Sequence, residues 1–148
     1  MFPAEEPRRI PLGIRPTNGL PFTAMIVDDS TMMQKLLAQI LKSEGFEVIA
    51  DADSGRVALG RYVSLPKKPD FVFLDVEMPE MDGVQTLAGL RKIDPEIKVV
   101  MVTSITDEGL VKKLVELGIS GYVVKPFKRE DLLVRVARIL GRSNYQPS

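Results

Sequence analysis

Five polar residues carry the groups with which this chain could do chemistry, and they stand where short apolar runs end. They are Asp28, Asp29, Asp75, Thr103 and Lys125. Carboxylates can hold a hard cation or act as oxygen nucleophiles, while a hydroxyl and an ammonium group can neutralise an anion. These residues are far apart along the chain. They form a site only if the fold brings the ends of the apolar runs together.

Composition narrows the chemistry further. The chain has no His and no Cys, which excludes disulfides, thiolate nucleophiles, histidine ligands and a phosphohistidine of its own. Basic and acidic residues number 20 each, so no overall field draws the protein toward nucleic acid or anionic lipid. No apolar run approaches the ~18 residues of a membrane span, and no signal peptide is apparent. We expect a cytoplasmic globular protein that binds neither nucleic acid nor membrane.

The apolar runs have strand length and alternate with longer stretches in which apolar residues recur every three to four positions. Several runs are almost continuously hydrophobic, as expected for parallel strands covered on both faces. The predicted strands are Thr23–Val27, Glu47–Ala50, Phe71–Leu74, Lys98–Val102 and Gly121–Val124.

A helix is predicted after each strand. The first should be capped by Ser30, the second should run from Ser54, the third should follow Asp82 and Gly83, and the fourth should be capped by Thr106. The last helix is acidic near its start and basic near its end, which suits the helix dipole. Strands alternating with helices imply right-handed crossovers and a doubly wound parallel sheet in an α/β fold.

In such a sheet the working site lies outside the carboxyl ends of the strands. Asp28, Asp29 and Asp75 should therefore converge there, together with Thr103 and Lys125. Carboxylates held close together repel, so the cluster needs a bound cation or a proton. Ligand atoms that are all oxygen indicate Mg²⁺.

Four motifs occur in order along the chain. They are Asp28-Asp29; Asp75-Val76-Glu77-Met78-Pro79 with Met81-Asp82-Gly83; Thr103; and Gly121-Tyr122-Val123-Val124-Lys125-Pro126-Phe127. Any one of them is weak, but the full set at this spacing is highly specific. Over about Phe22 to Gly141 the sequence resembles the response-regulator receiver family, and especially its single-domain chemotaxis type.

The resemblance implies a flavodoxin-like (βα)5 fold with the strand order 2-1-3-4-5. It implies that Asp75 is the phosphoacceptor, assisted by Lys125 and Thr103, and that the Lys125-Pro126 peptide is cis. The implied cofactor is Mg²⁺, held by Asp29 directly, by Asp28 through water, by the Asp75 carboxylate and by the Glu77 backbone carbonyl.

The physical reading agrees with a phosphoacceptor. A carboxylate attacks a dianionic phosphoryl group poorly because the charges repel, so the site must neutralise the phosphoryl oxygens. Mg²⁺ and Lys125 supply positive charge, and Thr103 supplies a hydrogen bond. The resemblance further implies that Thr103 and Tyr122 form the switch, moving after phosphorylation and reshaping the face made by the fourth helix, fifth strand and fifth helix.

We interpret the protein as a two-component response regulator. It is not an enzyme, beyond slow loss of its own phosphoryl group. The donor would be a histidine kinase or a histidine phosphotransfer protein. Residues 142–148 form a short tail, too short for an effector domain, so a monomer should signal through a protein partner on the switch face.

The N-terminal 21 residues contain five prolines and little periodicity. We expect residues 1–21 to be a flexible extension outside the receiver domain at 22–141, dispensable for folding.

Three other functions fit parts of the pattern. A Mg²⁺-dependent phosphohydrolase with an aspartyl nucleophile would use a second Asp two positions later, where this chain has Glu77. A nucleotide- or flavin-binding module would need a glycine-rich turn after the first strand, but the turn here is acidic. A scaffold receiver that works unphosphorylated would not need the complete set of chemical residues.

Overall fold

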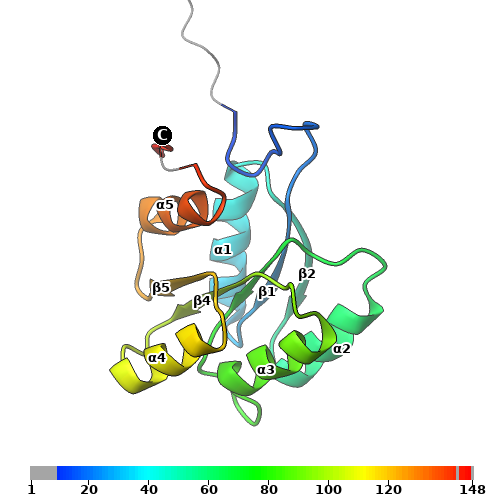
Figure 1. Ribbon diagram of the computed structural model, residues 1–148, viewed down its shortest axis with the longest axis vertical. Coiled ribbons are helices and arrows are strands. Elements are labelled where there is room, and N and C mark those ends of the chain that lie inside the picture. Colours follow the sequence, from blue (N-terminus) through cyan, green and yellow to red (C-terminus); the bar gives the residue numbers. More distant parts are fainter. Residues whose placement is uncertain (1–9, 143, 148) are drawn as a thin grey trace, which may run out of the picture.

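Five parallel strands form a sheet in the order β2-β1-β3-β4-β5 in the computed structural model, which describes residues 10–142 and 144–147 (Figure 1). The strands are β1 (Thr23–Val27), β2 (Glu47–Ala52), β3 (Phe71–Leu74), β4 (Val99–Thr103) and β5 (Gly121–Val124). The predicted α/β fold and strand order are confirmed. Strand β2 extends two residues beyond the expected end, and β4 begins one residue later than expected.

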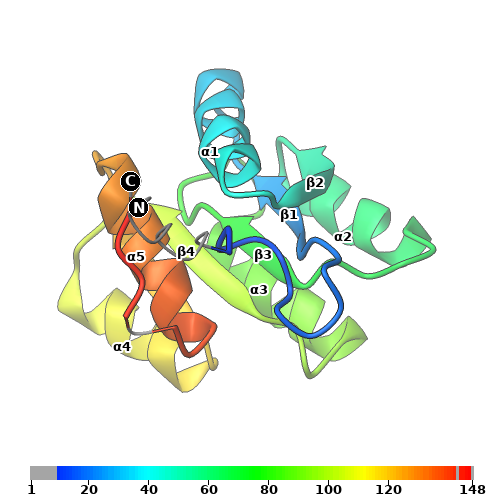
Figure 2. The same cartoon turned by 90° about the horizontal axis from the view of Figure 1, so that it is seen from above.

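The sheet lies between two layers of helices (Figure 2). Every residue of β1, β3 and β4 is buried, because successive side chains of a strand point to opposite faces and both faces are covered. In β1, for example, Ile26 packs into the core shared with α1 and α5, whereas Met25 packs into the core shared with α2, α3 and α4.

The helices are α1 (Thr31–Ser43), α2 (Gly55–Ser64), α3 (Gly83–Ile93), α4 (Glu108–Glu116) and α5 (Arg129–Ile139). Ser30 caps α1, as predicted, and Ser54, where the second helix was expected to start, caps α2. Each side chain accepts a hydrogen bond from the backbone N–H three residues later. Asp82 caps α3 and completes a capping box with Gln85. Within the described residues, none of the helices is long and apolar enough to cross a membrane.

The start of α4 differs from the prediction. Asp107, not Thr106, is the N-cap, and its carboxylate accepts from the Leu110 N–H at 3.0 Å. Asp is at least as good a cap as Thr, so the helix begins where the carboxylate satisfies its first free donors. Of the apolar residues of α4, Leu114 is fully buried, whereas the neighbouring Val115 is 61% exposed.

The N-terminal segment contradicts the prediction over the residues that the structure describes. Leu12 is fully buried and belongs to the core shared with α1 and α5. The Gly13 N–H donates to the Glu44 carbonyl at 2.7 Å, and a Cβ at Gly13 would lie 2.4 Å from the backbone nitrogen of Phe46. Residues 12–15 therefore pack on the domain, whereas residues 16–20 are exposed. The prolines suggested a flexible segment, but the burial of Leu12 was not predicted from them. The expected flexibility of residues 1–9 concerns residues outside the described part of the chain.

The C-terminal tail packs against Glu44 and the N-terminal segment. The Tyr145 ring is 9% exposed in the core, and its hydroxyl donates to Oε1 of the buried Glu44. Arg142 donates to the carbonyls of Ile10, at 3.0 Å, and Pro11, at 3.4 Å. The two terminal segments thus meet over the carboxyl end of α1, outside the predicted domain boundaries of 22 and 141.

Replacing Leu12 by Ala should lower the free energy of unfolding by about 2 to 3 kcal/mol, because the substitution leaves a cavity in a packed core. Chemical denaturation monitored by circular dichroism measures this change. Leu20, which is 56% exposed in the same segment, is the matched control, and Leu20→Ala should change stability by no more than about 0.5 kcal/mol. Equal stability of Leu12→Ala and the wild type would contradict the packing of this segment.

Candidate functional site

The carboxyl ends of four strands bring the predicted site residues together. Asp28 and Asp29 follow β1, and Asp75 follows β3. The strand ladder continues into the site, since the Asp75 N–H donates to the Val27 carbonyl and the Lys125 N–H donates to the Thr103 carbonyl. The side chains are thus anchored by the same hydrogen bonds that hold the sheet.

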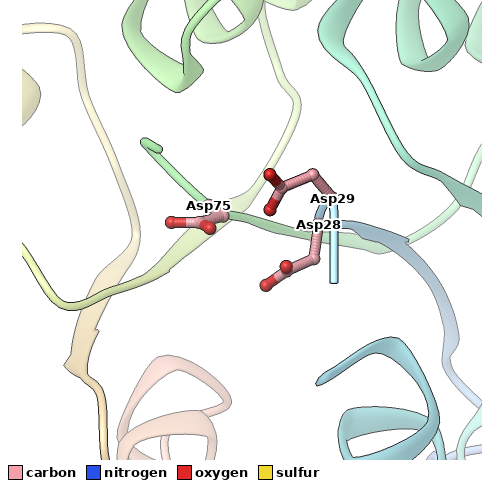
Figure 3. A group of neighbouring side chains, drawn as sticks. All are labelled: Asp28, Asp29 and Asp75. Carbon is pink, nitrogen blue, oxygen red and sulfur yellow. The ribbon is translucent and has the colours of Figure 1, made fainter. Parts of the chain in front are cut away.

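The three aspartates form one acidic cluster (Figure 3). Each can offer a carboxylate oxygen, and these oxygens lie within 4.8 Å of one another. Asp28 and Asp75 are 1% and 4% exposed, whereas Asp29 is exposed at the mouth. The sequence-based prediction that these residues converge matches the structure.

Lys125 bridges the two buried carboxylates. Its Nζ lies 2.8 Å from Oδ2 of Asp28 and 3.2 Å from Oδ2 of Asp75. Burial alone would lower the pKa of Lys125. The hydrogen bonds that its ammonium donates to Asp28 and Asp75, together with the negative charges of both, outweigh burial and raise the pKa. The ammonium therefore stays charged at neutral pH.

The backbone satisfies the remaining oxygens of the buried pair. Oδ1 of Asp28 accepts from the Ser30 N–H at 2.9 Å, and Oδ1 of Asp75 accepts from the Glu77 N–H at 3.1 Å. Burial raises the pKa of Asp28, although its bonds with Lys125 and the Ser30 N–H favour the charged form. Asp28 is thus a carboxylate whose ionisation costs free energy in the folded protein.

A glycine allows α3 to approach Asp75. A Cβ on Gly83 would lie 2.3 Å from the Asp75 carbonyl oxygen, a distance that real Cβ atoms do not reach. The Gly83 N–H donates to the Val76 carbonyl at 2.9 Å. The Asp82-Gly83 motif therefore caps the helix and packs its first turn against the Asp75 loop.

The cluster has the donor chemistry of a site for a hard divalent cation. The candidate ligand atoms of the three aspartates are all oxygen. With Lys125 as the ammonium in contact with the buried pair, three ionised carboxylates would leave an excess of two negative charges. Such an excess suits a divalent ion, so the residues present fit Mg²⁺.

Thr103 and Tyr122 lie beside the cluster. Thr103 is fully buried at the end of β4. The Tyr122 hydroxyl donates to the carbonyl of Ile105. Burial, with a contribution from the charge of Asp75, raises the pKa of Tyr122, so the phenol remains a donor. This bond connects β5 to the loop that follows Thr103.

One contact at the exposed edge of the acidic cluster is not apparent from the sequence. The Ser104 hydroxyl donates to Oε1 of Glu77, joining the loops that follow β4 and β3. The two residues are 27 positions apart, and both are exposed. The two residues are close because β3 and β4 are neighbours in the sheet. Local sequence patterns do not predict which strands become neighbours.

Residues 24–137 match the family described as response regulator receiver domain, and the chain belongs to this family. Its members are regulators in two-component signalling, and this chain is a CheY-like receiver. It is 39% identical over 132 residues to the chemotaxis protein CheY of Treponema pallidum, covering 89% of this chain and 91% of that protein.

Two further relatives agree. The chemotaxis protein CheY of Listeria monocytogenes is 38% identical over 109 residues, which cover 74% of this chain and 90% of that protein. Among solved structures, a CheX-CheY-BeF3-Mg+2 complex from Borrelia burgdorferi matches with a TM-score of 0.86 and 37% identity, covering 89% of this chain and 98% of that chain. The family predicted from the motifs is confirmed.

The raised pKa of Asp28 has a measurable effect on stability. The folded protein binds a proton at Asp28 more tightly than the unfolded chain does. The contribution of Asp28 to stability is therefore complete below the ordinary carboxyl pKa of about 4 and is lost as the pH rises through the folded pKa. Without Mg²⁺ at pH 7, Asp28→Asn should raise the Tm by about 2 to 4 °C, the shift that about 1 kcal/mol produces in a domain of this size.

Differential scanning calorimetry from pH 7 to pH 4 measures this difference, which should shrink as the pH falls. The control is Glu47→Gln, an exposed acid at the other end of the sheet, whose Tm should follow that of the wild type. A lower Tm for Asp28→Asn at pH 7 would show that the bond to Lys125 outweighs the cost of burial.

Proposed function

We propose that Asp75 accepts a phosphoryl group from a phosphohistidine of a histidine kinase or a histidine phosphotransfer protein. The observation that carries this proposal is the buried Asp75 carboxylate in contact with Lys125 and clustered with two more aspartates. A carboxylate oxygen of Asp75 would form a bond to phosphorus as the bond from phosphorus to the donor nitrogen breaks. The donor imidazole leaves and takes up a proton.

The chain's own groups would assist in different ways. Lys125 would shift from its present carboxylate partners toward the phosphoryl oxygens and neutralise part of their charge. The Thr103 hydroxyl would donate a hydrogen bond. Asp28, Asp29, Asp75 and the Glu77 backbone carbonyl would hold Mg²⁺, which supplies further positive charge for the transferring group. The similar CheX-CheY-BeF3-Mg+2 complex from Borrelia burgdorferi supports this assignment.

The output surface in this proposal consists of α4, β5 and α5. An open groove of about 550 Å³ lies there, lined by Val111, Tyr122, Val124, Phe127, Arg135 and Arg138. Tyr122 both lines this groove and bonds the loop after Thr103. A movement of Thr103 toward a phosphoryl group would displace the acceptor of the Tyr122 hydroxyl. The groove would change with it, so a protein partner could distinguish the two states.

Incubation with acetyl phosphate and Mg²⁺ should add one phosphoryl group to the wild type and none to Asp75→Asn, because the amide has no nucleophilic oxygen anion. Intact mass spectrometry counts the groups. Asp53→Asn, an exposed acid after β2, serves as the control and should be labelled like the wild type. Labelling of Asp75→Asn would refute the phosphoacceptor, and full labelling in excess EDTA would refute the role of Mg²⁺.

Thr103→Ala should separate the phosphorylation of Asp75 from the change at the output surface. Beryllofluoride with Mg²⁺ stands in for the phosphoryl group, and two-dimensional amide NMR compares the free and bound forms. In the wild type the shifts should reach Lys112, Tyr122 and Arg135. In Thr103→Ala those distant shifts should fall by more than half while Asp75 is still phosphorylated, and Thr103→Ser should retain them. Wild-type shifts confined to the Asp75 pocket would mean that the output surface lies elsewhere.

A further inference from the structure

The side chain of Gln34 reaches from the first turns of α1 to the ends of two strands. Its Nε2 donates to the Asp28 carbonyl at 2.7 Å and to the Ala52 carbonyl at 3.2 Å. A primary amide nitrogen has two hydrogens, so one group can serve both acceptors. The reversed amide would place an oxygen against two carbonyl oxygens, which fixes the orientation of the side chain.

This amide completes the last connection between β1 and β2. The pairing of these strands ends at Val27 and Ala52, and the Asp28 N–H then donates to the Ala52 carbonyl at 3.0 Å. Gln34 bonds the same Ala52 carbonyl and adds the carbonyl of Asp28. A single side chain thus connects α1 to both strand ends at the point where β1 enters the acidic cluster.

Asp28 is consequently held at every polar group. Its N–H and carbonyl are fixed as described, Oδ1 accepts from the Ser30 N–H, and Oδ2 contacts Lys125. The Asp28 carbonyl belongs to the peptide unit that leads into Asp29. Holding that carbonyl therefore sets the direction in which the chain enters Asp29. Because Asp29 is exposed, its position depends on the backbone on either side of it.

We propose that Gln34 is a positioning residue for the cation site, which it serves by fixing the peptide between Asp28 and Asp29. The inference rests on the proposed Mg²⁺ site. Carboxylates that converge on a cation must be held against their mutual repulsion, and only one of the three, Asp29, lacks burial to restrict it. The position requires two N–H donors and no negative charge, which an amide supplies and a carboxylate or thioether does not.

The variant Gln34→Met tests this role because methionine has nearly the same length but no donor. Isothermal titration with MgCl₂ should show a dissociation constant about fivefold higher than that of the wild type. The rate of phosphorylation by acetyl phosphate at saturating Mg²⁺ should stay within about twofold, because Gln34 does not touch the reacting atoms. Gln39→Met makes the same chemical change at an exposed position of α1 and should leave the dissociation constant unaltered.

Each outcome bears on a different claim. A wild-type protein that does not bind Mg²⁺ would overturn the proposed cation site itself. If the wild type binds and Gln34→Met binds equally well, Gln34 has no positioning role, and a lower Tm would then mark it as structural only. A slower saturating rate with an unchanged dissociation constant would also overturn the proposal. Gln34→Asn, one methylene too short to reach both carbonyls, should weaken Mg²⁺ binding in the same way and replaces the first variant if that does not fold.

Discussion

The ammonium group of Lys125 lies between two buried carboxylates that would otherwise repel one another, and the arrangement of the sheet serves this contact. Asp28 comes from β1, Asp75 from β3 and Lys125 from β5. They meet because the strands are parallel and end at one edge. Moving any of these strands by one residue would turn the side chain at its end to the other face. The observed pairing of Val27 with Leu74 sets where β1 and β3 end, and two apolar cores hold these strands in place. The packing of the core thus positions the charged groups of the site.

The site and the rest of the domain have opposite effects on stability. Burying Asp28 disfavours its charged form, and the acidic cluster carries more negative charge than Lys125 neutralises. Two apolar cores and the packing of both terminal segments offset this cost. A cluster that is unfavourable on its own responds strongly to added positive charge or to a new partner, which is the behaviour that a regulator requires. A neutral, well-packed site would be more stable and less responsive.

Local patterns predicted most of the sheet, because apolar runs of strand length and polar residues at their ends are visible without an alignment. Ser30, Ser54 and Asp82 were identifiable as helix starts for the same reason. The terminal segments were not predictable, since Leu12 lies in a proline-rich stretch without helix or strand periodicity. Tyr145, which belongs to the same core cluster, lies at the other end of the chain. The contacts of Ser104 with Glu77 and of Gln34 with Ala52 were also missed. They join elements that are neighbours only after the strands have assembled.

Both terminal segments lie at the amino edge of the sheet, where α1 ends, while the acidic cluster lies at the carboxyl edge. Arg142 donates hydrogen bonds to the carbonyls of Ile10 and Pro11, so the first and last described segments of the chain lie next to each other. A short linker could join them, and new ends could then be opened in a surface loop, giving a circular permutant with the same sheet. By the same geometry, a domain or fluorophore fused directly before Ile10 or after Pro147 would stand away from the acidic cluster and leave it open to a docking partner.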